Sequence, residues 1–320
     1  MARIGMNERL LILNIGRLGD TILCNSILEA AFSSYPQVDY LCGKNNAGLM
    51  RCESRLGKVL VFENTFSGFS SVLNQALLHR YDAIIGLKEC YSSTNLFLAR
   101  LFRSPLKTGW NGNYLKPFHR DVRGIYSPAI HKVEMMRRIG DLAELKPAEY
   151  RPHLTVPPSS IEWFRKTYTG YVPFIFVNIS ATHPNRVWPV EKWARYIQGC
   201  GFAQERILVN GVPTDQEMVR KLSQSLPRAT AFAPRHFLDV AAAVSDARLV
   251  LSVDTGVVHA CSALNRPLIA FYRADRPGPM PLSDEQLVIQ PTNSDKVADI
   301  DPDQAIRQTL GYKGAIDLLR

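Results

Sequence analysis

Short runs of consecutive hydrophobic residues alternate along the chain with segments in which hydrophobic residues recur at helical spacing. In the first part of the chain, the runs expected to form strands are residues 9–15, 38–43, 58–64 and 81–88. The segments expected to form helices between and after them are residues 20–33, 71–79 and 94–102. Strands that are hydrophobic on both sides are typical of a parallel sheet covered by helices, so the alternation predicts an α/β fold.

A proline-rich stretch interrupts this pattern. It covers residues 146–160 and follows a segment of helical periodicity at residues 131–145. Because proline disfavours helix interiors and central strands, we interpret the stretch as an extended linker. The alternation then resumes, with strands expected at residues 172–180, 206–211, 248–253 and 267–272, and helices at residues 237–245 and 256–264 and from Val190 and Asp215.

The pattern therefore predicts two doubly wound domains, which the chain length of 320 residues also favours. The expected boundaries are residues 1–157 for the first domain and residues 158–300 for the second. Residues 301–320 are expected to form a C-terminal helix, opened by Asp301 and Pro302, that packs back toward the first domain. We expect the two domains to face each other across a cleft.

Composition narrows the class of protein. Hydrophobic residues make up 46% of the chain and charged residues 21%, which indicates a soluble globular protein. Hydrophobic runs fall far below the roughly 18 residues that a membrane span needs, and the initial Met-Ala-Arg has no apolar region typical of a secretory signal. Six cysteines without paired spacing indicate buried thiols rather than a zinc or disulfide framework. We therefore expect a cytoplasmic protein.

The formal net charge of +9 is unevenly distributed. Residues 1–157 contain 20 Lys and Arg against 13 Asp and Glu, whereas residues 158–320 contain 18 against 16. The excess in the first half indicates an anionic partner, which could be nucleic acid, a membrane surface or an acidic substrate. Basic and aromatic residues are interleaved in residues 100–123: Arg100, Arg103, Lys107, Trp110, Tyr114, Lys116, Phe118, Arg120 and Arg123. A solvated basic face is the alternative interpretation of this segment.

Four loops at the carboxyl ends of expected strands contain residues that could carry chemistry, since ligands of open parallel sheets bind at that edge. The first is "IGRLGDTIL", in which Gly16 and Gly19 allow a tight turn and Asp20 opens the next helix. The dinucleotide fingerprint G-x-G-x-x-G is absent and no acidic residue ends the next strand, which argues against an NAD site. Asp20 is either a functional carboxylate or a helix cap, for which aspartate is a preferred residue.

The second loop, "NISATHPNRVWPVEKW", has Ser180 and Arg186 after an expected buried strand. The guanidinium of an arginine matches phosphate oxygens, and a solvated loop arginine is the alternative. The third loop, "VNGVPTDQEM", places Asp215 and Glu217 at a helix start, where either carboxylate could accept hydrogen bonds from ribose hydroxyls. Acidic residues are also common at helix starts that bind no ligand.

The fourth loop, "LSVDTGVVHA", runs from a buried strand into a helix. Thr255 is placed to cap this helix, and Gly256 allows close approach to its free N–H groups, so the loop predicts an anion site that suits a diphosphate. Asp254 precedes the cap, and His259 lies just inside the helix, where a structural role is the alternative. The chain has no D-x-D motif at an expected donor site and no His/Cys cluster, so neither a metal nor a cofactor is expected.

The order of these motifs resembles glycosyltransferase family 9, the ADP-heptose:lipopolysaccharide heptosyltransferases. Gly19-Asp20 matches the family's G-D at the start of its first helix, and Ser180 with "RVWP" matches its serine loop and basic W-P motif. "DTGVVH" matches its D-T-G-x-x-H, and residues 131–145 fit the closing helix of its first domain. The resemblance covers nearly the whole chain. It implies the GT-B architecture, with two Rossmann-like domains, the acceptor on the first and the nucleotide sugar on the second.

The resemblance also implies roles for the matching residues. Asp20 falls on the family's general base, and Arg186 stands where a phosphate-contacting lysine is usual. The implied donor-site residues are Ser180, Arg186, Glu217 (at the ribose), Asp254, Thr255, Gly256 and His259. The implied reaction is an inverting displacement in which a helix amino terminus and Arg186, rather than a metal, stabilise the leaving diphosphate.

The donor implied by the resemblance is ADP-heptose, and the acceptor is the Kdo or heptose of the anionic lipopolysaccharide core. The protein would then act peripherally at the cytoplasmic face of the inner membrane. The acceptor contacts are expected from cations of the first domain, namely Arg17, Lys116, Arg120 and Arg123.

Alternatives remain open. Asn210-Gly211 stands where the family has a glycine pair, and Tyr272-Arg273 stands where it often has Gly-Pro. Because both pairs line the expected nucleotide pocket, another nucleotide sugar, or a protein or distal-core acceptor, is the main alternative. A non-enzymatic nucleic-acid or anion-binding protein is suggested by the pI of about 9.3, but no nucleic-acid-binding module is found.

Overall fold

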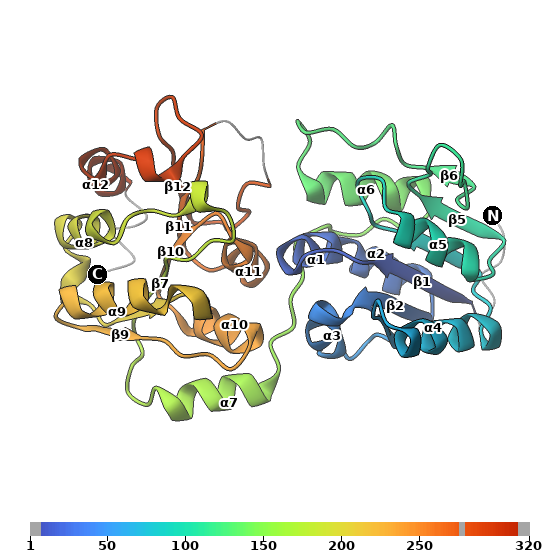
Figure 1. Ribbon diagram of the computed structural model, residues 1–320, viewed down its shortest axis with the longest axis horizontal. Coiled ribbons are helices and arrows are strands. Elements are labelled where there is room, and N and C mark those ends of the chain that lie inside the picture. The colour runs from blue at the N-terminus through green and yellow to red at the C-terminus, as the bar shows by residue number, and fades with distance from the viewer. Residues whose placement is uncertain (1–7, 275–278, 313–320) are drawn as a thin grey trace. The chain divides into compact units, whose positions relative to one another are not determined.

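The computed structural model describes residues 8–274 and 279–312. The chain divides into two compact units. Unit 1 consists of residues 1–155 with 277–279, and unit 2 consists of residues 156–276 with 280–320. Each unit contains one six-stranded parallel sheet with helices packed on it (Figure 1), which confirms the predicted α/β fold of two doubly wound domains.

The sheet of unit 1 has the strand order β3-β2-β1-β4-β5-β6. Its strands are β1 (Arg9–Asn14), β2 (Gln37–Gly43), β3 (Val59–Phe62), β4 (Ala83–Gly86), β5 (Leu106–Gly109) and β6 (Arg120–Asp121). Its helices are α1 (Leu18–Cys24), α2 (Leu28–Ser34), α3 (Lys44–Arg51), α4 (Phe66–Leu78), α5 (Ser93–Leu101) and α6 (Lys132–Leu142). The strand order reverses between β1 and β4, and ligands of such sheets bind at the carboxyl ends of strands beside this point.

Strand β1 lies at the centre of this sheet, and Leu10–Leu13 have no exposed surface. Leu11 and Leu13 belong to the same hydrophobic cluster as residues of α4 and α5, whereas the residues between them point to the other face. Burial on both faces explains why the sequence of this strand is continuously hydrophobic. The apolar run ends at Asn14, whose amide donates to the Tyr40 hydroxyl at 2.8 Å.

The sheet of unit 2 has the order β12-β11-β10-β7-β8-β9. Its strands are β7 (Ile175–Asn178), β8 (Ile207–Asn210), β9 (Ala229–Ala231), β10 (Leu249–Val253), β11 (Leu268–Phe271) and β12 (Gln286–Ile289). Its helices are α7 (Pro158–Thr167), α8 (Val190–Gly199), α9 (Gln216–Ser225), α10 (Phe237–Asp246), α11 (Gly256–Leu264) and α12 (Pro302–Gly311).

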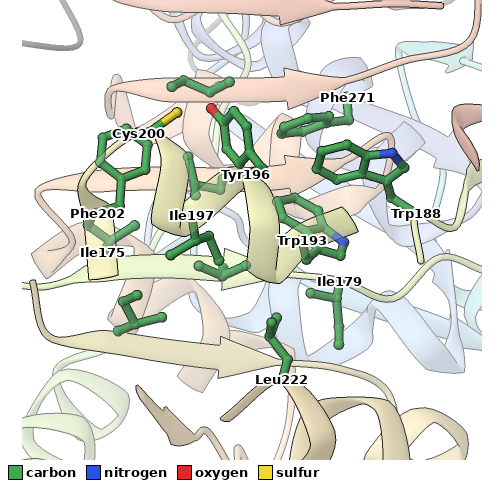
Figure 2. Close-up of a cluster of buried hydrophobic side chains, with 14 of the residues drawn as sticks. Ile175, Ile179, Trp188, Trp193, Tyr196, Ile197, Cys200, Phe202, Leu222 and Phe271 are labelled. Carbon is green, nitrogen blue, oxygen red and sulfur yellow. The ribbon is translucent and has the colours of Figure 1, made fainter. Parts of the chain in front are cut away.

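Aromatic side chains dominate one core of unit 2. Figure 2 shows Trp193 and Tyr196 of α8 beside Phe271 of β11, with Trp188 from the preceding loop. The ring centroids of Trp188 and Phe271 are 4.6 Å apart, and those of Trp193 and Phe271 are 4.7 Å apart. All four side chains are fully buried, so this cluster holds α8 and the loop before it firmly on the sheet.

The predicted linker is wrong at its carboxyl end. Residues 145–157 form no helix or strand, but α7 begins at Pro158, with Pro157 as its N-cap. Proline lacks a backbone N–H, and the first helical position needs none, so a proline there starts a helix instead of preventing one.

The described part of the C-terminal segment also differs from the prediction. Helix α12 packs against α8 within unit 2, whereas we expected residues 301–320 to pack toward the first domain. The hydroxyl groups of Tyr196 and Thr309 form a buried hydrogen bond of 2.8 Å, and Arg195 pairs with Asp303 at 2.6 Å. These contacts bind α12 to α8. Residues 313–320 lie outside the described part of the chain.

Several elements have no counterpart among those predicted: α3, β5, β6, β9 and β12. The four strands have two to four residues and lie at or near the sheet edges, where too few positions face the core to produce a periodic pattern.

The cysteines are all free, and Cys24, Cys42, Cys200 and Cys261 are buried as predicted. The prediction is wrong for Cys90, which is exposed in the loop after β4. In the residues that the structure describes, no helix combines the length and apolar character needed to cross a membrane.

Candidate functional site

Polar side chains meet at the carboxyl ends of three neighbouring strands in unit 2. The amide of Asn178, at the end of β7, donates to the hydroxyl groups of Ser252 and Thr255 at 3.1 Å each. Asn210, at the end of β8, donates to Asn178 Oδ1 at 2.8 Å. This strand-end network fixes the loops after β7, β8 and β10 relative to one another.

The loop after β10 has the predicted cap geometry. Thr255 is the N-cap of α11, and its hydroxyl accepts a hydrogen bond from the backbone N–H of Val257 at 3.3 Å. Gly256 is the first helical residue. A helix amino terminus has N–H groups without intrahelical partners and a partial positive charge, so this one favours an anion.

Arg186 contacts the same loop. It ends the short 3-10 helix Pro184–Arg186, and its Nη1 donates to the carbonyl of Asp254 at 3.1 Å and lies 3.3 Å from Asp254 Oδ2. The side chain is 18% exposed, and its buried Nε has no hydrogen-bond partner within the described ranges. A buried guanidinium N–H that lacks an acceptor, next to a helix amino terminus, is satisfied by an anion such as a phosphate.

Trp188 holds Arg186 in place. Its indole Nε1 donates to the carbonyl of Ile300 at 3.2 Å, and its ring packs on Phe271 (Figure 2). Pro189 then forms the N-cap of α8. Since Trp188 lies two residues after Arg186, its burial restrains the backbone from which the guanidinium extends.

Ser180 and His259 are both buried. Ser180 is 3% exposed, and its hydroxyl accepts a hydrogen bond from the N–H of Val212 at 3.0 Å. A Cβ on Gly211 would lie 2.7 Å from that hydroxyl, which explains glycine at this position. Ser180 therefore joins the loops after β7 and β8. His259, in α11, is 6% exposed.

Glu217 is not part of the strand-end network. Its side chain is 59% exposed and pairs with Arg220 at 2.7 Å on the surface of α9. The hydrogen bond from Arg220 lowers the pKa of Glu217. Each carboxylate oxygen can accept more than one hydrogen bond, so the ribose contact stays a prediction.

Two positions that depart from the family pattern are buried at the same edge of the sheet. Asn210 is 6% exposed, and its Oδ1 has no hydrogen-bond partner in the part of the chain that the structure describes. Tyr272 and Arg273 follow β11 and are 1% and 8% exposed. Burial holds the pKa of Tyr272 well above its ordinary value, so its hydroxyl is neutral.

In unit 1, Asp20 is not a helix cap. Helix α1 begins at Leu18, two residues earlier than predicted, and its N-cap is Arg17. Asp20 lies in the first turn, where the helix dipole favours a carboxylate. The loop before it is fixed by Asn46 of α3, whose amide donates to the Gly16 carbonyl and the Thr21 hydroxyl at 2.8 Å each.

Asp20 pairs with a residue that the sequence did not indicate. The ammonium of Lys132, the first residue of α6, lies 2.7 Å from Asp20 Oδ1 and 2.9 Å from Glu89 Oε2. The Lys132 side chain is 8% exposed, and Asp20 is 37% exposed. The sequence does contain a signal for Glu89, which lies just after β4. Strand β4 neighbours β1, so the carboxyl end of β4 lies at the same edge of the sheet as Asp20.

The predicted basic segment does not form one surface. Lys107 is buried, and its ammonium donates to the carbonyls of Ala99 and Phe102 at 2.7 and 2.6 Å. Phe118 is 4% exposed and belongs to the hydrophobic core. Arg100 and Arg103 line a cavity of about 530 Å³ near the amino end of β5, at the opposite edge of the sheet from Asp20.

The four residues expected to contact the acceptor differ in exposure and in ion pairing. Arg17 and Lys116 are exposed, and Arg123 follows β6 and pairs with Asp121 at 2.7 Å. Arg120 donates to the carbonyl of Leu142 at 2.7 Å and pairs with Glu144 at 2.5 Å. Arg120 therefore binds the carboxyl end of α6, whereas Lys132 and Asp20 meet at its amino end. The acceptor contact expected at Arg120 stays a prediction.

Two doubly wound parallel sheets, with an anion-favouring helix amino terminus on the second, define the GT-B class of glycosyltransferase folds. The chain belongs to glycosyltransferase family 9 (heptosyltransferase), whose sequence model matches residues 71–303.

Relatives and solved structures agree with this assignment. The chain is 31% identical over 100 residues to lipopolysaccharide heptosyltransferase 1 of Escherichia coli, a match that spans 31% of each chain. It is 24% identical over 243 residues to lipooligosaccharide heptosyltransferase 2 of Haemophilus influenzae, with 68% of each covered.

The fold is similar to that of the glycosyl transferase family 9 structure from Veillonella parvula, with a TM-score of 0.82, 18% identity, and 98% of this chain and 97% of that chain covered. It is also similar to the E. coli heptosyltransferase WaaC with ADP, with a TM-score of 0.77, 19% identity, and 95% and 99% covered.

Proposed function

We propose that this protein is an inverting, metal-independent heptosyltransferase that moves heptose from ADP-heptose to the Kdo or heptose of a lipopolysaccharide core. The observation that carries the proposal is the position of Arg186. Its guanidinium lies beside the amino terminus of α11, and its buried Nε has no acceptor within the described ranges. A diphosphate would supply that acceptor.

The donor site is built from unit 2. Thr255 and Gly256 present the amino terminus of α11 to the diphosphate, and Asp254 holds Arg186 beside it. Ser180 keeps the neighbouring loops in place, His259 lies in the same helix, and Glu217 is the proposed ribose contact. ADP is the proposed nucleotide because a solved relative of the same fold is described with ADP.

The proposed reaction is a single displacement. The acceptor hydroxyl oxygen forms a bond to the anomeric carbon of heptose, and its proton passes to the carboxylate of Asp20. The bond from that carbon to the β-phosphate oxygen breaks, and the electron pair stays on the phosphate. The helix dipole and Arg186 stabilise the developing negative charge, which is the task that a divalent metal performs in other glycosyltransferases.

In buffer containing excess EDTA, we expect ADP to raise the melting temperature more than GDP or UDP, and ADP-heptose to support transfer to lipopolysaccharide core. At equal ligand concentration, a nucleotide that binds the folded state more tightly stabilises it more, so the shift ranks the nucleotides. The measurements are thermal unfolding and product formation by mass spectrometry. Activity that EDTA abolishes and Mg²⁺ restores would contradict metal independence, and a preference for GDP or UDP would replace the proposed donor.

The acceptor is proposed to bind unit 1 through Arg17, Lys116, Arg120 and Arg123. Arg17 and Lys116 are exposed cations, and Arg123 lies just after β6. An acceptor with phosphate and carboxylate groups would pair with them. We propose that the protein associates peripherally with the cytoplasmic face of the inner membrane, where such an acceptor is held. Co-sedimentation with vesicles that contain the acceptor measures this, and equal recovery with neutral vesicles would contradict it.

Replacing Lys116 and Arg123 together by alanine is expected to raise the KM for the acceptor about tenfold or more and to leave ADP affinity unchanged, since each phosphate contact is a charge-assisted hydrogen bond. Steady-state kinetics and ADP titration make the comparison. Arg151→Ala is the matched control, because Arg151 is an exposed arginine of unit 1 that pairs with Glu149. Equal loss of ADP affinity in the double variant would show that these residues do not act on the acceptor.

A second candidate is a family 9 transferase with another nucleotide sugar, or with a protein or distal-core acceptor. It is favoured by the buried Asn210 and Arg273, which replace the glycine pair and Gly-Pro usual in the family. The nucleotide comparison described above separates the donors, and transfer to a protein but not to lipopolysaccharide core would favour the other acceptor.

A further inference from the structure

Lys132 occupies a position that is unfavourable for a lysine. It is the first residue of α6, where the helix dipole disfavours a positive charge. Its side chain is 8% exposed, so the ammonium has also lost most of its hydration. A buried ion pair gives little or no net stability compared with apolar residues that fill the same space. Stability alone therefore does not account for a lysine here.

Two carboxylates compensate this charge. Asp20 Oδ1 lies 2.7 Å and Glu89 Oε2 lies 2.9 Å from the ammonium, so each carboxylate is within contact distance of the same nitrogen. Burial acts to lower the pKa of Lys132, whereas the neighbouring Asp20 and Glu89 carboxylates act to raise it. With two carboxylates in contact with its ammonium, Lys132 is held in its charged form.

Two titratable groups close to this cluster are neutral. The Cys24 thiol is fully buried, and burial raises its pKa to about 12. Burial also holds the pKa of Tyr126 well above its ordinary value. Both groups are thus neutral at physiological pH. Lys88 and Cys90 flank Glu89 in the chain, and His131 caps α6 by accepting from the N–H of Val133. Asp20, Lys132 and Glu89 form the charged centre of this group.

We infer that Lys132 is a positioning residue that holds the Asp20 carboxylate ionised and oriented for proton abstraction, and that Glu89 is the counter-ion that keeps Lys132 in place. The inference rests on the proposed function where it takes Asp20 as the general base. It adds two residues of unit 1, Lys132 and Glu89, that set the protonation state of Asp20.

The second carboxylate has a specific use during turnover. When Asp20 takes the proton of the acceptor hydroxyl, its negative charge is lost and its pairing with Lys132 weakens. Glu89 remains ionised beside the ammonium, so Lys132 still has a counter-ion and does not need to move. The cluster thus changes from two carboxylates to one while its buried cation stays paired, and loss of the proton to solvent restores Asp20 for the next cycle.

The test uses two substitutions with opposite expected signs. Lys132→Met removes the cation and leaves two carboxylates close together, so we expect the titration midpoint of Asp20 to rise by about one pH unit or more. Glu89→Gln removes the like charge, so the midpoint should fall. In the double variant, it should lie between that of Lys132→Met and that of the unaltered protein. Carboxyl-carbon NMR of the full chain measures these midpoints without any substrate, and Asp20→Asn assigns the signal.

Kinetics then connects the cluster to the reaction. In the pH profile of kcat/KM, the acid limb should move in the same direction as the Asp20 midpoint in each variant. Lys132→Arg should keep the acid limb at the position of the unaltered protein, because it keeps the charge. Arg137→Met is the matched control, since Arg137 is an exposed cation of the same helix that pairs with Glu134 and Asp141. It should move neither the midpoint nor the limb.

The outcomes are distinguishable. If Glu89→Gln and Lys132→Met both leave the Asp20 midpoint where it was, the inference is wrong. If Lys132→Met fails to fold, an unchanged midpoint in Glu89→Gln alone is enough to overturn it. If the midpoints move as expected but the acid limb does not follow, Asp20 is not the base, and both the inference and that part of the proposed function fail. If no nucleotide sugar supports transfer, the proposed function fails on the donor comparison, whereas the NMR midpoints still decide the charge coupling.

Discussion

Asp20→Asn is expected to lower the rate of sugar transfer by at least about 100-fold while the protein stays folded and binds ADP normally. A positioned general base contributes roughly that much or more, and asparagine has nearly the same shape as aspartate but cannot accept the proton. The cost in stability should be small. The substitution removes a helix-dipole interaction of about 0.3–1 kcal/mol. It also removes one of the two counter-ions of Lys132, but Glu89 still pairs with the ammonium. Single-turnover transfer, thermal unfolding and ADP titration measure the three quantities.

Glu29→Gln is the control for this substitution. Glu29 is also a first-turn acid in unit 1, at the start of α2, and it pairs with Arg55 at 2.7 Å. The two substitutions make the same chemical change at comparable helix positions, so a general effect of losing a helical carboxylate would appear in both. Transfer by Asp20→Asn at a rate close to that of the Glu29 variant would show that the base is another group.

The second large effect is expected at Arg186. Alanine at this position should reduce kcat by about 100-fold and weaken ADP binding, because removal of one donor from a site that stabilises developing charge typically costs that much. Arg186→Lys should recover part of the loss, since it keeps the charge without the two-pronged geometry of the guanidinium. Steady-state kinetics and ADP titration measure both effects.

Arg195→Ala separates this effect from a loss of structure. Arg195 is a paired arginine of α8 in unit 2, but it is 61% exposed and contacts Asp303 rather than the loop after β10. It should leave transfer and ADP affinity unchanged. If Arg186→Ala keeps full activity with ADP-heptose, the leaving diphosphate is stabilised elsewhere and the donor site must be reassigned.

The central part of each sheet could be predicted from the sequence because its strands are buried on both faces. Apolar runs such as residues 10–13 and 249–251 indicate buried strands in a chain with helical segments between them. Helix α11 was predicted with its observed bounds, since Thr255 caps it and Asn265 ends it in the left-handed conformation. Helix α7 is not predicted, because proline usually breaks a helix. In the structure, Pro157 is its N-cap and Pro158 is its first residue, a position that proline suits.

The candidate site could be predicted only where its residues lie close together in sequence. Asp254, Thr255 and Gly256 form one motif, and the structure adds Arg186 to it through a contact across 68 positions. The pairing of Asp20 with Lys132 joins residues 112 positions apart and depends on how α6 packs against α1, which no local pattern encodes. The same limit explains the basic segment. Charge was visible in residues 100–123, but not the burial of Lys107 or the commitment of Arg120 to the end of α6.

The division of the chain has a consequence for how the protein is made. Every described strand and helix of unit 1 lies between Arg9 and Leu142, and unit 2 begins at Val156. The first sheet can therefore be completed on the ribosome before any strand of the second has been synthesised, as domains commonly fold in the order of their synthesis. Asp20, Glu89 and Lys132 would then come together early in the life of the nascent chain. The Arg186 site would form only after Asp254 has been added.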